Sequence, residues 1–179
     1  MVLRPIGLSW IKGAADDPAD LCAHGHVEFR VEEHVLIDPA TGPEVTVSAA
    51  ALYLLRTLSK AHTKAEPVGE QLFPCCGFAM YDIAGQDDVL VVGCPSGLDF
   101  EILHAENETV IVVRAGDGRE FRVAWSAWVE AVYRFCDLVA EFYAKSSPKK
   151  PSADDVVGFT RFTAEWRRRR GTPLVAPPR

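Results

Sequence analysis

The sequence lacks any long hydrophobic run. No stretch approaches the roughly 18 consecutive apolar residues that a membrane-spanning helix needs. The apolar beginning of the chain is interrupted by Pro5 and Gly7 and ends at Lys12, and no small-residue cleavage pattern follows it. It therefore does not have the pattern of a secretory signal peptide. We expect a cytoplasmic protein that has no membrane partner.

Cysteines are few, and their number and spacing exclude a disulfide framework. The count is odd and the spacing is irregular: Cys22, Cys75, Cys76, Cys94 and Cys136. Their mostly apolar surroundings are typical of reduced, buried thiols in a cytosolic protein. The sequence also has no CxxC, HExxH or EF-hand spacing, so it contains no highly specific metal or catalytic motif.

Positive charge is in the minority. The chain has 19 Lys and Arg against 25 Asp and Glu, a net charge of −6, which argues against nucleic acid as the main partner. The distribution is uneven, because residues 1–113 hold 6 basic and 17 acidic residues while residues 114–179 hold 13 and 8. The 179 residues, 48% of them hydrophobic, fit one globular domain.

The periodicity predicts strands first and long helices last. Residues 26–37 alternate in polarity, as in a half-buried strand that bends or turns near Glu32, and a helix of about four turns follows Ser48. Five further strands are expected at 78–83, 89–93, 98–104, 109–114 and 119–124, separated by turn residues. Apolar stripes then predict helices at about 126–145 and 153–170, the second ending at Gly171.

These elements predict the α+β class. We expect one antiparallel β-sheet of about five to seven strands, arranged as a β-meander, with one early helix and two long C-terminal helices packed against it. Residues 1–171 would form this single domain, and residues 172–179 a Pro-rich tail.

Cys22, His24 and His26 are the best candidate metal ligands in the sequence. Alternate residues of a strand share a face, and imidazole and thiolate both bind zinc well. A complete site would need further ligands, which could come from Cys75, Cys76 or another histidine. The alternative is a polar entry into a strand with no bound ion.

Three further cysteines carry weaker signals. The adjacent Cys75 and Cys76 could form a redox pair or part of a metal site, but they also read as small buried residues beside a glycine turn. Cys94 could be a nucleophile if a histidine lay beside it, although CPSG is chiefly a hairpin turn. The sequence does not say whether Cys75, Cys76 and Cys94 meet in space.

Acidic residues gather on the predicted meander: Asp82, Asp87, Asp88, Asp99 and Glu101. Such a cluster could bind a divalent cation, form a docking surface for a basic protein, or be a solvated face of the sheet. At the opposite end of the chain, Arg167–Arg170 occupy the last turn of a helix, where they complement the negative end of its dipole.

The segment from Gly69 to Gly171 carries FPCCG, GCPSGLDFEI, FYAKSSPK and GFTRFTAEWRRRRG. It resembles a group of small, mostly uncharacterised bacterial proteins, similar in size and architecture to immunity-type proteins that neutralise a toxin encoded nearby. The resemblance implies no chemistry for individual residues.

These observations favour a non-enzymatic binding protein. An immunity-type inhibitor would dock its acidic face on a basic toxin, since toxins that act on nucleic acids tend to be basic. The alternative is a metal- or thiol-dependent enzyme that uses Cys22, His24 and His26, or Cys94, with zinc as the conceivable cofactor. Assembly into a homo-oligomer through partly exposed tryptophans is a third hypothesis.

Overall fold

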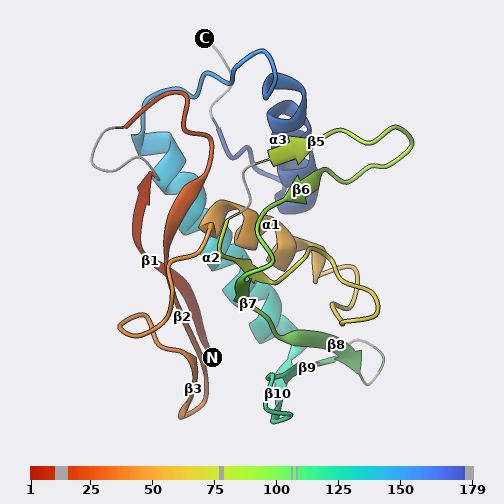
Figure 1. Ribbon diagram of the computed structural model, residues 1–179. Helices are drawn as coiled ribbons and strands as arrows, with labels where there is room; N and C mark the ends of the chain where they lie inside the picture. The colour runs from red at the N-terminus through yellow and green to blue at the C-terminus, as the bar shows by residue number, and fades with distance from the viewer. Residues whose placement is uncertain (11–15, 77–78, 106, 108, 176–179) are drawn as a thin grey trace.

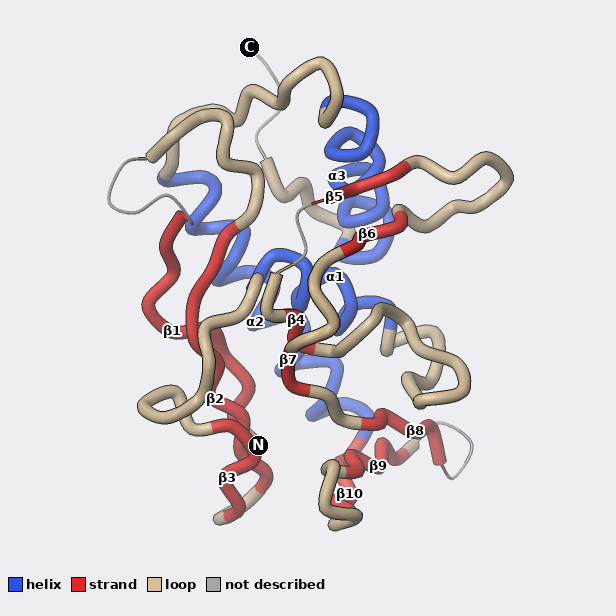
Figure 2. The backbone as a smooth tube through the Cα atoms, in the orientation of Figure 1, coloured by secondary structure: helices blue, strands red, loops and turns tan. Residues whose placement is uncertain are grey.

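The computed structural model describes residues 1–10, 16–76, 79–105, 107 and 109–175. Within these ranges the chain is α+β, with three helices and several small antiparallel sheets (Figures 1 and 2). The predicted class is therefore confirmed. The predicted single sheet is wrong, because the strands divide between two three-stranded sheets and two pairs.

The first sheet has the order β1-β2-β3, formed by Val2–Trp10, Ala23–Val31 and His34–Ile37. Val27, Phe29 and Val31 are buried, as the alternation predicts. The pattern holds only in part, because Glu28 on the opposite face is also buried and Val35 is exposed. A tight turn at Glu32, with a φ of 53°, divides the expected strand into β2 and β3. Strand β1 was not predicted, because Pro5 interrupts its pattern; an edge strand tolerates a proline.

Helix α1, Val47–Arg56, lies at the centre of the molecule, and every one of its residues is buried. It begins one residue before the expected cap at Ser48 and is shorter than the expected four turns. After the helix ends at Arg56, the chain reaches His62, which forms a β-bridge with Ile102. This bridge covers part of the edge of the second three-stranded sheet.

The expected meander is divided at the segment from Cys94 to Gly97. Strands β5 (Ala79–Tyr81) and β6 (Leu90–Val92) form one hairpin, and β8 (Glu101–Ala105), β9 (Val110–Arg114) and β10 (Glu120–Ala124) form a separate sheet. Between them, β7 (Gly97–Leu98) pairs with β4 (Phe73–Pro74) instead of continuing either sheet. Phe78, at the start of a predicted strand, lies outside the described residues.

The two helices predicted at about 126–145 and 153–170 are present. Helix α2 (Trp125–Lys145) follows β10 directly and packs on β1 and α1, so it connects the two three-stranded sheets (Figure 1). Helix α3 (Val156–Arg170) packs on α1 and on β5, and ends at Gly171 in the left-handed conformation. It begins three residues after the predicted start near residue 153, and its first residue, Val156, is exposed.

Near the end of the described chain, Leu174 is buried in the core. Residues 176–179 of the predicted tail lie outside the described residues. Among the helices of the described chain, none combines the length and the apolar character that crossing a membrane requires.

Candidate functional site

Three cysteines meet between the two short strand pairs. The sulfur atoms of Cys75, Cys76 and Cys94 all lie within 4.8 Å of one another. Cys75 is exposed, whereas Cys76 and Cys94 are half-buried, so an ion or a small reagent can reach the group from solvent. In the described residues this is the one group of three His, Cys, Asp or Glu side chains close enough to share a metal ion.

The pairing of β4 with β7 positions one side of this cysteine cluster. Cys75 directly follows β4, and its backbone N–H donates to the Ser96 carbonyl at 2.9 Å. Gly97 faces Pro74 in this pairing, and a Cβ atom there would lie 2.6 Å from the Phe73 carbonyl oxygen. Glycine is therefore needed for the two strands to approach this closely. Phe73 anchors β4 in the core against Phe29 and Phe100.

The β5–β6 hairpin positions the other side. Its register pairs Ala79 with Val92, which brings the segment after β4 close to the segment after β6. The backbone N–H of Cys94 donates to the Cys76 sulfur at 3.0 Å. Backbone N–H donors aimed at sulfur stabilise negative charge on it, as they do around metal-bound thiolates.

The three thiols share hydrogen bonds, which separates their acidities. Hydrogen bonding to Cys76, and then to the Ser96 backbone, lowers the pKa of Cys94 to about 7. The same interaction raises the pKa of the Cys76 thiol, and hydrogen bonding to Cys94 also raises that of Cys75. Cys94 is therefore the most acidic thiol of the cluster and the first of the three to become a thiolate as the pH rises.

Among the described residues, Cys22, His24 and His26 do not form a group whose ligand atoms are close enough to share one metal ion. Cys22 is buried, and burial raises its pKa to about 12. His24 is buried with no hydrogen-bond partner for Nε2, while the Nδ1 of His26 lies 3.2 Å from the Gly42 carbonyl oxygen. The proposed zinc ligation by these three residues stays a prediction.

The two histidines nearest to Cys94 in the sequence, His62 and His104, hydrogen-bond to other groups of the fold. His62 is buried; its Nε2 lies 2.9 Å from Asp99, and its Nδ1 accepts the Val68 backbone N–H. Both ring nitrogens are thus engaged within the fold, and the proton sits on Nε2. His104, which is half-buried, has its Nε2 2.8 Å from the Thr57 carbonyl oxygen. These hydrogen bonds hold both rings against other parts of the fold.

The five acidic residues of the predicted docking face divide between two places, each with internal partners. Asp82 pairs with Arg161 of α3, and Asp88 pairs with Arg168 and Arg169. Around β8, Asp99 accepts from His62 and the Leu72 N–H, and Glu101 pairs with Arg114. Asp87 offers its backbone oxygen to Arg168. The acidic and basic halves of the chain therefore neutralise each other in part.

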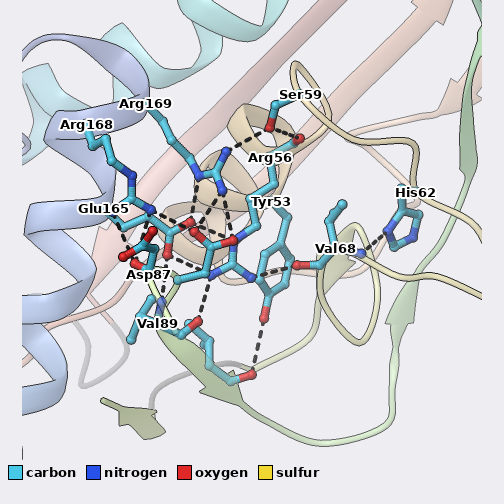
Figure 3. A network of polar contacts seen from close by, with 12 residues as sticks. Tyr53, Arg56, Ser59, His62, Val68, Asp87, Val89, Glu165, Arg168 and Arg169 are labelled. Atoms are coloured by element: carbon cyan, nitrogen blue, oxygen red, sulfur yellow. Dashed lines mark hydrogen bonds and ion pairs between the residues drawn. The ribbon is translucent and has the colours of Figure 1, made fainter. Parts of the chain in front are cut away.

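A buried ion pair connects α1 with α3 at the centre of these contacts (Figure 3). Arg56 donates to both carboxylate oxygens of Glu165 at 2.8 Å, and to the Val68 and Val89 carbonyls at 2.7 Å. A pocket of about 530 Å³ opens beside it. Four of the five N–H donors of Arg56 already bond to partners within the protein, so this network is chiefly a contact between elements of the fold.

Comparisons of the chain with protein-family models, with curated proteins and with solved structures gave no match. The immunity-type resemblance and the docking of an acidic face on a basic toxin thus stay predictions from the sequence. The sequence alone left open whether Cys75, Cys76 and Cys94 meet in space. The available signal was that both segments, FPCCG and GCPSG, place cysteine directly before a turn residue.

Proposed function

We propose that the protein binds a soft metal ion through Cys75, Cys76 and Cys94. The single observation that carries this proposal is the convergence of three sulfur atoms within 4.8 Å of one another at a solvent-accessible position. Thiolate ligands favour soft ions, of which Cu⁺ and Zn²⁺ are the common biological examples. Sulfur atoms this close need only small side-chain adjustments to surround one ion.

The number of ligands defines the kind of site. In the described part of the chain, no fourth His, Cys, Asp or Glu joins the group. Three protein ligands leave one position of a tetrahedral zinc site open to water or to another molecule, as in catalytic rather than structural zinc sites. Three sulfur ligands alone also satisfy Cu⁺. The proposed site is therefore open to exchange of its ion with solvent or with another thiol-containing molecule.

The surroundings of the sulfur atoms support this role. The Cys94 N–H that donates to the Cys76 sulfur would stabilise a metal-bound thiolate. The Cys75 backbone is fixed on both sides, by its own N–H to Ser96 and by the Thr46 hydroxyl, which donates to the Cys75 carbonyl. Ligands on fixed backbone pay less ordering entropy on binding an ion.

The test is metal binding by the reduced protein, expressed without a histidine tag. Equilibrium dialysis against Zn²⁺, and an anaerobic titration with Cu⁺, should give one ion per chain for at least one of the two metals. Cys94→Ser should lose this binding. Cys136→Ser is the matched control, because Cys136 is buried away from the cluster and the new hydroxyl can donate to the Ala51 carbonyl, as the thiol does at 3.6 Å.

Two results would overturn the proposal. One is a wild-type protein that retains less than about a tenth of an equivalent of either metal, since a formed thiolate site binds tightly. The other is Cys94→Ser protein that binds as much metal as the Cys136→Ser control. Circular dichroism of both variants establishes that a loss of binding does not come from unfolding.

A further inference from the structure

The cysteine cluster also has the arrangement of a dithiol that can be oxidised. We propose that Cys76 and Cys94 form a reversible disulfide, and that this disulfide closes the metal site by removing two of its three sulfur ligands. The pairing itself follows from the geometry of the chain. Its regulatory consequence rests on the proposed metal binding.

Cys76 is the partner of Cys94 for two reasons. The Cys76 sulfur already lies 3.0 Å from the backbone nitrogen of Cys94, and both residues are half-buried. Cys75 instead has its backbone nitrogen bonded to Ser96, and its side chain is exposed. A bond between the adjacent Cys75 and Cys76 would need the strained geometry that neighbouring residues impose.

The fold keeps the sulfur atoms of Cys76 and Cys94 close together, although no covalent bond joins them in this structure. The 18-residue separation between Cys76 and Cys94 is spanned by the β5–β6 hairpin, whose register pairs Ala79 with Val92 near its open end. A disulfide has a sulfur–sulfur distance of about 2.05 Å, so rotation of side chains that are within 4.8 Å can form it.

The reaction requires an oxidant, and a low-molecular-weight disulfide such as glutathione disulfide meets that need. The Cys94 thiolate attacks one sulfur of glutathione disulfide, which forms a mixed disulfide and releases one glutathione thiolate. Cys76 then loses its proton to solvent and attacks the Cys94 sulfur, which releases the second glutathione thiolate. Two protein thiols are oxidised to one disulfide, and one glutathione disulfide is reduced to two thiols.

The two buried cysteines do not compete for this reaction. Cys22 and Cys136 lie in the core, where a dissolved disulfide cannot reach them. After the reaction Cys75 remains as a free, exposed thiol. A single thiol cannot replace the three-sulfur site, so oxidation should release the ion and reduction should restore binding.

The test uses the full chain, reduced and freed of metal, in buffers of varied glutathione and glutathione disulfide. Acid quenching and alkylation preserve the thiol state for peptide mapping by mass spectrometry. Trypsin cannot separate the cysteines, because no Lys or Arg lies between Lys64 and Arg114, but cleavage before Asp82, Asp87 and Asp88 places Cys76 and Cys94 on different peptides. A cross-linked pair of these peptides should form with excess glutathione disulfide and disappear with excess glutathione.

The variants decide the pairing. Cys75→Ser should keep the cross-link, and Cys76→Ser should leave Cys94 as a glutathione adduct. If Cys75→Ser loses the cross-link while Cys76→Ser keeps it, or if the wild-type protein gives only glutathione adducts, the proposed pairing is wrong. The same reduced samples are titrated with metal. Metal binding without a cross-link overturns this inference alone, whereas a cross-link in protein that binds no metal overturns the proposed function and its regulation.

Discussion

Gly97→Ala disrupts the proposed metal site without changing any sulfur atom. The new methyl group would lie 2.6 Å from the Phe73 carbonyl oxygen, 3.1 Å from the Pro74 Cα and 3.2 Å from the Cys75 nitrogen. All three neighbours are backbone atoms, so no flexible side chain can move aside. Strand β7 must therefore shift away from β4.

The size of this shift follows from the contact. Cβ atoms are essentially never found closer than 3.0 Å to such a neighbour, so the strands must separate by at least about 0.4 Å. Metal–ligand distances tolerate only about 0.2 Å. Because Cys75 moves with β4 and Cys94 precedes β7, we expect metal affinity to fall about 10- to 100-fold, the usual effect of losing a supporting interaction. The overpacked contact should also reduce the free energy of unfolding by about 1–3 kcal/mol.

The assay is competition for the bound ion with a chelator of known affinity, together with urea denaturation of the same samples. Gly116→Ala is the control for adding a methyl group to a glycine: Gly116 lies between β9 and β10, and an added Cβ there meets nothing within 4 Å. It should keep both the affinity and the stability of the wild-type protein. Gly97→Ala protein that binds metal as tightly as this control would refute the argument that β4–β7 pairing positions the ligands.

Three further outcomes follow from the structure. Glu165→Gln should reduce the free energy of unfolding by about 3 kcal/mol, because it leaves the buried Arg56 charge without its carboxylate partner. The control Glu141→Gln, at an exposed position, should reduce it by less than about 0.5 kcal/mol. Equal midpoints of urea denaturation for the two variants would contradict this. Burial lowers the pKa of His24 below 6.5, so the unfolded chain takes up its proton first and stability should fall as the pH decreases through 6.5. The His24→Leu variant should lose this slope in urea denaturation, and an unchanged slope would assign it to other groups. In metal-free protein, iodoacetamide should label Cys94 before Cys75 and Cys76, and the rate of this labelling should rise around pH 7. The buried Cys22 and Cys136 should stay unreactive. Peptide mapping that finds Cys75 labelled first would contradict the order of thiol pKa values.

Local patterns in the sequence predicted the elements that bury a regular stripe. The 4, 3, 4, 3 spacing from Trp128 predicts α2, and the alternation around Phe29 predicts β2. Strand β1 has no such pattern, because Pro5 and a bulge between Ile6 and Ser9 interrupt it. Its pairing with β2 stabilises it instead, and that partner is not visible in a local window.

The division of the sheet and the cysteine cluster depend on long-range pairing. Strands β4 and β7 have two residues each, which is too short for any periodic signal, yet their pairing separates the hairpin from the second three-stranded sheet. The same pairing brings Cys75 toward Cys94. The charge imbalance was visible in the sequence, but the partners of Asp88 on α3 became clear only in the folded chain.

X-ray absorption at the metal edge identifies the atoms that bind the ion. In wild-type protein loaded with one equivalent of Zn²⁺ or Cu⁺, whichever binds, we expect three sulfur ligands around the ion, at about 2.3 Å if the ion is zinc. The Cys94→Ser variant should bind no ion, or hold it with fewer sulfur atoms. A first shell made only of nitrogen and oxygen would contradict metal binding by Cys75, Cys76 and Cys94.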